Sequence, residues 1–159
     1  MKSIILFLSV TFPIAASATC WEAAGERYGI DPILLKAIAW KESRGHPNAV
    51  GPKLKDGNVA LGLMQINTVH LPTLAQFGIR RENLFDACTS QEVGAWVLSN
   101  CIGEFGATWK AVGCYYAGPK SKNTVAQIGY VKDVQNFYAG YKRQEQQRAV
   151  AQDIALKGD

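Results

Sequence analysis

The chain lacks the residue patterns that most metal sites and nucleic-acid sites require. It has two histidines, His46 and His70, and no two cysteines at the CxxC spacing, so neither residue type forms a typical zinc site. No run of lysine and arginine is interleaved with aromatic side chains, which argues against a nucleic-acid partner. Internal repeats and linker-like stretches are missing as well. These absences favour one domain that holds no metal and no other cofactor.

Long hydrophobic runs are missing beyond the N-terminus. There, Lys2 is followed by an apolar stretch from Ile4 to Ile14 and by Ala16-Ser17-Ala18, which is the order of a secretory signal peptide and its cleavage site. The apolar stretch contains Pro13 and is too short to span a bilayer comfortably. We therefore expect residues 1–18 to be a cleavable signal peptide, and the rest of the chain to be exported without stable membrane insertion.

Cysteine is scarce, but its number is even. Cys20, Cys88, Cys101 and Cys114 all lie after the expected cleavage site. An even count in an exported chain indicates two disulfides, and four cysteines allow three pairings. We expect Cys20 to pair with Cys88, which would tie the first helix to the middle of the chain. Cys101 would then pair with Cys114 and join two consecutive helices.

The clearest local signal is a helix over residues 32–43. Asp31 suits the N-cap of this helix and Pro32 suits its first position, where no backbone N–H is needed. Gly45 and Pro47 follow the expected end. The sequence therefore predicts both ends of the helix.

One face of this helix carries a carboxyl group among apolar side chains. Leu35, Ile38 and Glu42 fall at i, i+3 and i+7 and share that face. Partial burial and the negative end of the helix dipole both disfavour the charged carboxylate, so both raise the pKa of Glu42. A carboxyl group that is neutral near pH 7 can protonate a leaving group. The alternative is a frayed helix end with a solvated Glu42.

The rest of the chain indicates further helices joined by loops. We expect helices over residues 20–28, 68–77, 90–103, 108–116 and 123–141, a loop or small hairpin over 46–60, and a compact apolar segment over 61–67. Ser90 is the expected cap of its helix. The inward face of the last helix is predicted to carry Val125, Ile128, Val131, Val134 and Tyr138. The class is α+β, mostly α, in a single domain over residues 19–141 where residues 46–67 form one wall of a cleft.

Residues 142–159 differ from that domain in composition. They read KRQEQQRAVAQDIALKGD, which suits a helix but contains few large apolar side chains. Because such a segment can bury little, we expect a frayed and solvated polar tail. Docking onto a partner protein is the alternative.

Four motifs occur in a fixed order. They are Glu42-Ser43 at a helix end, Gly62-Leu63-Met64-Gln65-Ile66-Asn67, the segment AVGCYYAG from Ala111 to Gly118, and Gly129-Tyr130-Val131. Together they resemble the soluble lytic transglycosylase family, which has a lysozyme-like fold, over essentially the whole chain after residue 18. The small size and the signal peptide look most like the specialised members that accompany type III or conjugative type IV secretion systems.

The resemblance implies a peptidoglycan lytic transglycosylase. Such an enzyme cleaves the β-1,4 bond between N-acetylmuramic acid and N-acetylglucosamine and leaves 1,6-anhydro ends. Glu42 would be the acid on the leaving oxygen, and then the base that takes a proton from the sugar's own 6-hydroxyl. A lysozyme-type hydrolase and a non-catalytic wall-binding assembly protein on the same fold are the alternatives.

The resemblance also implies a set of substrate-binding residues. Gln65 and Asn67 can exchange hydrogen bonds with sugar hydroxyl and acetamido groups. Met64 offers an adaptable apolar surface for a sugar face, whereas without the resemblance it would be read as a core residue. Tyr115 and Tyr130 are expected near the catalytic carboxyl and the N-acetyl group, and core packing is the alternative for both. The full set is Ser43, Met64, Gln65, Asn67, Tyr115 and Tyr130.

The sequence departs from the family pattern at three positions. Tyr116 replaces the asparagine of the usual Tyr-Asn-Ala-Gly motif. Ala60 stands where secretion-associated relatives often have an aspartate, and Asp56 is then the nearest upstream carboxylate. Gly51 stands where larger relatives often have a serine. These departures put the usual polar role of each position in doubt.

Location and partners follow from the same resemblance. The expected compartment is the periplasm, and the expected partner is the peptidoglycan glycan strand. The formal net charge of +4 suits work against an anionic polymer, although many unrelated exported domains carry as much. Proteins of the secretion apparatus are a further candidate, through the C-terminal tail.

Overall fold

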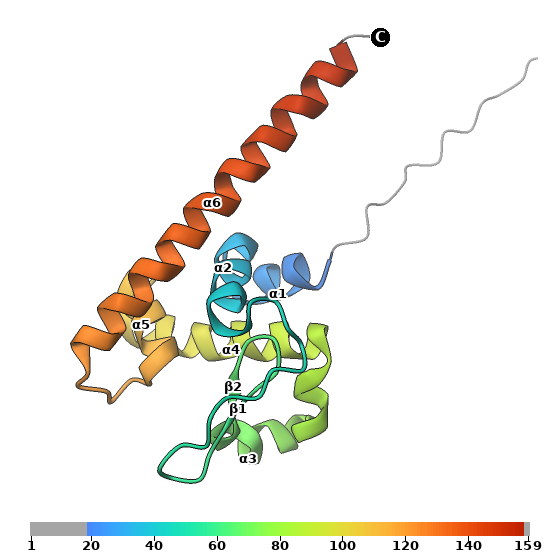
Figure 1. Cartoon of the computed structure of the whole chain (residues 1–159). Coiled ribbons are helices and arrows are strands. Elements are labelled where there is room, and N and C mark those ends of the chain that lie inside the picture. Colours follow the sequence, from blue (N-terminus) through green and yellow to red (C-terminus); the bar gives the residue numbers. More distant parts are fainter. Residues whose placement is uncertain (1–18, 158–159) are drawn as a thin grey trace, which may run out of the picture.

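The computed structural model describes residues 19–157, so the expected signal peptide lies outside the described part of the chain. Figure 1 shows short helices and a small hairpin packed together, with one long helix running past them. The elements are α1 (Cys20–Tyr28), α2 (Pro32–Ser43), β1 (Ala60–Leu61), β2 (Ile66–Asn67), η1 (Thr68–His70), α3 (Leu71–Leu74), η2 (Ala75–Phe77), η3 (Arg81–Phe85), α4 (Ala87–Phe105), α5 (Trp109–Ala117) and α6 (Thr124–Lys157). The expected class, mostly α with a small β part, is confirmed.

Helix α2 lies at the centre of the packing and begins as predicted. The Asp31 side chain accepts a hydrogen bond from the Ile33 N–H at 2.8 Å, and Pro32 opens the helix. Leu35 and Ile38 on its inner face are fully buried. Around it, α4 packs on α1 and α5, and α6 packs on α2 and α5. These contacts enclose one core that is common to both halves of the chain.

Two disulfides join the helices around this core. Cys20 at the start of α1 pairs with Cys88 in the first turn of α4, and Cys101 in α4 pairs with Cys114 in α5. Both predicted pairings are confirmed. The first closes a long stretch of chain, with a sequence separation of 68, and so constrains the unfolded chain more than the second, with a separation of 13.

The segment between α2 and α3 is a loop followed by a short hairpin. Strands β1 and β2 are antiparallel, with Ala60 opposite Asn67 and Leu61 opposite Ile66. The preceding loop turns at Asp56-Gly57 as predicted, because the Asn58 N–H donates to the Asp56 carboxylate at 3.0 Å. In Figure 1 this loop and hairpin lie on the α3 side of α4, away from the free end of α6.

Two details of the helices differ from the expectation. Helix α4 begins at Ala87 with Asp86 as its cap, where the carboxylate accepts from the Thr89 N–H at 2.8 Å. Ser90 is buried inside the helix, so its prediction as the cap is wrong. On α6, Val125 is 83% exposed and Ile128 is 51% exposed, so their predicted inward orientation is also wrong. Val134 is buried on α6 as expected.

Helix α6 does not end near Tyr141 but continues to Lys157. The predicted helix end is therefore wrong, and its physical cause is local. Glycine and proline are absent between 142 and 157, and the segment consists mainly of residues with high helix propensity. Residues 142–157 are exposed throughout, as expected of a segment that can bury little.

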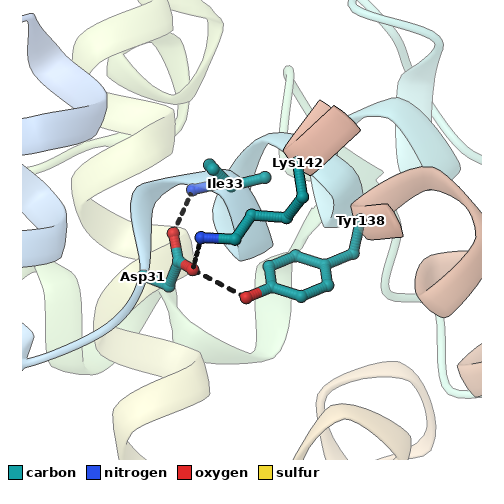
Figure 2. A network of polar contacts seen from close by, with 4 residues as sticks. All are labelled: Asp31, Ile33, Tyr138 and Lys142. Atoms are coloured by element: carbon teal, nitrogen blue, oxygen red, sulfur yellow. Dashed lines mark hydrogen bonds and ion pairs between the residues drawn. The ribbon is translucent and has the colours of Figure 1, made fainter. Parts of the chain in front are cut away.

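A polar network attaches α6 to the start of α2 (Figure 2). The second carboxylate oxygen of Asp31 accepts a hydrogen bond from the Tyr138 hydroxyl at 2.7 Å and pairs with the Lys142 ammonium at 3.3 Å. These contacts lower the pKa of Asp31 against the opposing effect of burial. Asp31 therefore caps α2 and also binds α6 at Tyr138 and Lys142.

None of the helices within residues 19–157 has the length and apolar character needed to cross a membrane.

Candidate active site

Glu42 lies in the last turn of α2, at the end of its apolar face. The side chain is half-buried, and its Oε1 accepts a hydrogen bond from the Tyr130 hydroxyl at 2.6 Å. Burial raises the pKa of Glu42 to about 7, against the opposing effects of the Tyr130 hydrogen bond and the Lys41 charge. Both the acid form and the base form of the carboxyl group are thus accessible near neutral pH.

Tyr130 on α6 is held on several sides. Its ring stacks on Tyr116 of α5, with centroids 4.7 Å apart and planes 18° apart. The Lys41 ammonium lies over the Tyr130 ring at 6.0 Å from its centroid, and Lys41 is ion-paired with Asp133 of α6. Burial and the nearby Glu42 raise the pKa of Tyr130 well above its usual value, so its hydroxyl remains a donor.

The backbone of residues 62–65 is fixed by side chains from three helices. Ser43 of α2 donates to the Leu63 carbonyl at 2.7 Å, and Tyr115 of α5 donates to the Met64 carbonyl at 2.7 Å. The Met64 N–H donates to the Ser90 hydroxyl of α4 at 3.0 Å. Buried backbone groups need such partners, and here the loop between β1 and β2 obtains them from α2, α4 and α5.

The loop also requires small residues at its contacts. Gly62 has φ +75°, and a Cβ at this position would lie 1.9 Å from the Leu84 carbonyl oxygen. The Met64 side chain packs on Gly94 of α4, where a Cβ would lie 2.6 Å from the Met64 Cε. At both positions a larger residue would force the neighbouring group to move.

Gln65 and Asn67 already use part of their amide groups within the loop. Gln65 has φ +49°, and its Nε2 donates to the carbonyl oxygens of Ala49 at 3.2 Å and Gly62 at 2.9 Å. Asn67 Oδ1 accepts from the Val69 N–H at 2.9 Å and so caps η1. The Gln65 contacts connect the turn between β1 and β2 with the loop before β1, and the Asn67 contact stabilises the turn that follows β2.

The transglycosylase SLT domain family matches residues 19–138 of this chain. The chain belongs to the transglycosylase SLT family. It is accordingly a peptidoglycan lytic transglycosylase.

Relatives of similar length support the assignment to the SLT family. The X polypeptide of Escherichia coli is 37% identical over 147 residues, which cover 89% of this chain and 86% of that protein. Invasion protein IagB of Salmonella typhimurium is 39% identical over 140 residues, which cover 87% of this chain and 85% of that protein. Protein IpgF of Shigella flexneri is 36% identical over 139 residues, covering 87% and 91%.

A solved structure shares the fold of this SLT domain. It is the lytic transglycosylase Slt of Pseudomonas aeruginosa, determined as an inactive variant with glutamine in place of a glutamate. The TM-score is 0.65 at 23% identity, and the match covers 85% of this chain and 25% of that larger one. The predicted lysozyme-like fold is therefore confirmed.

The SLT domain brings only some of the predicted site residues close to Glu42. Tyr130 contacts Glu42, and the Glu42 charge acts on the pKa of Tyr115. Met64, in contrast, is 0% exposed, so its predicted role as an apolar surface for a sugar is wrong and its side chain belongs to the core. Ser43 is buried too, and its hydroxyl serves the Leu63 carbonyl.

Two residues of the site were not predicted. Tyr116 was singled out only as a departure from the family motif, yet it stacks directly on the tyrosine that contacts Glu42. Lys41 adjoins Glu42 in the sequence and lowers its pKa, but a single lysine on a helix carries no signal that would identify it.

Among the described residues, no other carboxylate acts on the pKa of Glu42, and Asp133 reaches the site only through its ion pair with Lys41. Asp56 is exposed on its turn, where its carboxylate accepts from the Asn58 N–H. The groups that shift the pKa of Glu42, apart from burial itself, are Tyr130 and Lys41. Within residues 19–157, clusters of three or more His, Cys, Asp or Glu side chains that could hold a metal are also missing.

Proposed function

We propose that this transglycosylase cleaves the β-1,4 bond between N-acetylmuramic acid and N-acetylglucosamine without using water, and that Glu42 serves as acid and then as base. The observation that carries the proposal is the half-buried carboxyl group of Glu42, whose pKa of about 7 suits both tasks. The inactive glutamate-to-glutamine variant of the Pseudomonas aeruginosa Slt is consistent with an essential glutamate in this fold.

In the first half of the reaction, the protonated Glu42 gives its proton to the glycosidic oxygen as the bond from C1 to that oxygen breaks. The acetamido group of the substrate then stabilises the positive charge at C1. In the second half, the Glu42 carboxylate takes the proton of the 6-hydroxyl as the bond from C1 to O6 forms. Glu42 is protonated again at the end, so one group completes the cycle.

Within residues 19–157 no second carboxylate acts on the pKa of Glu42, and this favours ring closure over hydrolysis. An inverting hydrolase needs a carboxylate that activates water, and a retaining one usually needs a carboxylate nucleophile. Position 60 is Ala60, and Asp56 faces solvent. A 6-hydroxyl held by the bound sugar also has a large effective concentration relative to water. We therefore expect 1,6-anhydro products, with Gln65, Asn67, Tyr115 and Tyr130 as candidate substrate contacts.

Mass spectrometry of a digest of purified peptidoglycan tests this proposal. The expected products are 1,6-anhydromuropeptides, which are lighter by one water than hydrolysed products. A parallel digest with Asp56→Asn should give the same products at nearly the same rate. Mainly reducing-end products, together with a severe defect in Asp56→Asn, would show a hydrolase with two carboxylates.

We further propose that the enzyme works in the periplasm and opens the wall locally for a secretion or conjugation apparatus. Two disulfides are typical of an oxidising compartment, and residues 1–18 have the composition of a signal peptide. The relative IagB is named an invasion protein, which is compatible with service to an apparatus. The exposed part of α6 is the candidate docking segment for apparatus proteins.

A further inference from the structure

Tyr116 lies next to the candidate acid without touching it. Its ring is 50% exposed on α5 and stacks on Tyr130, with a centroid distance of 4.7 Å and an interplanar angle of 18°. Tyr130 is 4% exposed, and its hydroxyl contacts Glu42 Oε1 at 2.6 Å. Stacked aromatic rings at this separation attract one another beyond the burial of their surfaces. Tyr116 is therefore connected to Glu42 through one intervening residue, Tyr130.

We propose that Tyr116 is a positioning residue for the transglycosylase reaction, because its ring holds the Tyr130 ring in the orientation that keeps the Tyr130 hydroxyl on Glu42. The inference rests on the proposed role of Glu42 as acid and base. It assigns a task to one of the three positions at which the sequence departs from the family pattern.

Geometry explains why the Tyr130 ring needs such support. The hydroxyl lies at the far end of the side chain, so a small rotation of the ring moves it away from the carboxyl oxygen. The Lys41 ammonium of α2 lies over the Tyr130 ring at 6.0 Å from its centroid, and Asp133 of α6 holds Lys41 through an ion pair. The stack from α5 adds a contact over the surface of the ring. An asparagine at position 116 could not provide it.

The hydrogen bond matters most after Glu42 has given up its proton. A donor to a carboxylate stabilises the charged form and fixes the direction of its lone pairs. The second carboxylate oxygen is then free to accept the proton of the 6-hydroxyl. A loosened Tyr130 would leave the carboxylate free to rotate, which slows the step in which the carboxylate acts as base.

The pH profile reports this contact specifically. The titratable groups that face Glu42 are Lys41 of α2, Tyr115 of α5 and Tyr130 of α6. Tyr116 stacks on Tyr130, and Tyr130 lowers the pKa of Glu42 through the hydrogen bond. Weakening the stack should therefore raise the pKa of Glu42 and move the alkaline limb of the kcat profile upward.

The experiment compares Tyr116→Leu, Tyr116→Phe and Tyr130→Phe on soluble, uncrosslinked glycan strands over a range of pH. Because a stack of this kind is modest in free energy, Tyr116→Leu should lower kcat about three- to tenfold, with KM within about twofold of the wild type. Its alkaline limb should move upward. Tyr116→Phe keeps the ring and should retain the wild-type rate and profile. In the Tyr130→Phe background, Tyr116→Leu should have little further effect.

Other outcomes would contradict the proposal in distinguishable ways. A higher KM in Tyr116→Leu at unchanged kcat, additive with Tyr130→Phe, would make Tyr116 a substrate contact instead. If Tyr130→Phe leaves the alkaline limb unchanged, Glu42 is not the titrating group and the proposed function itself fails. Tyr116→Asn serves as a second variant without the ring. It should reproduce the effect of leucine, and a wild-type rate and profile in it would refute the positioning role.

Discussion

Glu42→Gln replaces an ionisable carboxyl by a neutral amide of the same shape at a half-buried position. The amide cannot transfer the proton, so activity should fall about 10²- to 10⁴-fold, as is typical when a general acid–base group is removed. The amide oxygen can still accept the Tyr130 hydrogen bond. The same substitution should therefore change stability in the opposite direction to activity.

The sign follows from the raised pKa of Glu42. The unfolded chain releases this proton near pH 4.5, whereas the folded chain keeps it up to about pH 7. Between these values the folded state binds more protons, so the free energy of unfolding falls as the pH rises and stays low above pH 7. A shift from 4.5 to about 7 corresponds to at most about 3 kcal/mol at 1.36 kcal/mol per unit. Glutamine does not ionise, so Glu42→Gln removes this loss of the free energy of unfolding at high pH.

Thermal melting at two pH values tests the argument. Glu42→Gln should melt at nearly the wild-type temperature at pH 4 and up to roughly 6–12 °C higher at pH 8, given about 2–4 °C per kcal/mol for a chain of this size. Glu26→Gln on the exposed side of α1 is the matched control and should show no such dependence on pH. A melting difference that is equal at both pH values, or activity within about twofold of wild type, would refute the reasoning.

Three further predictions concern the rest of the domain. Removing either disulfide should cost about 2–4 kcal/mol of the free energy of unfolding. Intact mass of the exported wild-type protein, with and without reductant, should show two disulfides and no free thiol. Gly62→Ala should cost about 2–5 kcal/mol in chemical denaturation because its Cβ would meet the Leu84 carbonyl, whereas Gly78→Ala, with open space around it, should cost about 1–2 kcal/mol. Truncation after Lys142 should leave fold and intrinsic activity intact and abolish any pull-down of apparatus proteins; a large fall in melting temperature would place the removed segment in the folded core.

Local signals were sufficient for the part of the fold that carries Glu42. The helix that holds it begins and ends where its caps indicate, and its apolar spacing gives the buried face. The disulfide pairings were also predicted correctly. In these cases each prediction depended on residues close in sequence or on a small number of possible pairings.

Predictions failed where the answer depends on tertiary contacts. Val125 and Ile128 have the spacing of a buried face, yet both remain exposed at the start of α6. Ser90 has the chemistry of a cap, yet a backbone N–H from the 62–65 loop takes its hydroxyl. Met64 was assigned to the substrate surface only through the family resemblance, and Gly94 opens a place for its side chain in the core. Sequence alone does not reveal which distant group each side chain will contact.

The two ends of α2 face different tasks. Asp31 at its start holds α6 through Tyr138 and Lys142, and Glu42 at its end is the candidate acid. Beyond Lys142, α6 extends for roughly another 20 Å at 1.5 Å per residue (Figure 1). Helix α6 packs on the helix that carries Glu42, as well as on α5. A partner bound to the exposed end of α6 would therefore be joined, through one continuous helix, to the element that carries the candidate acid.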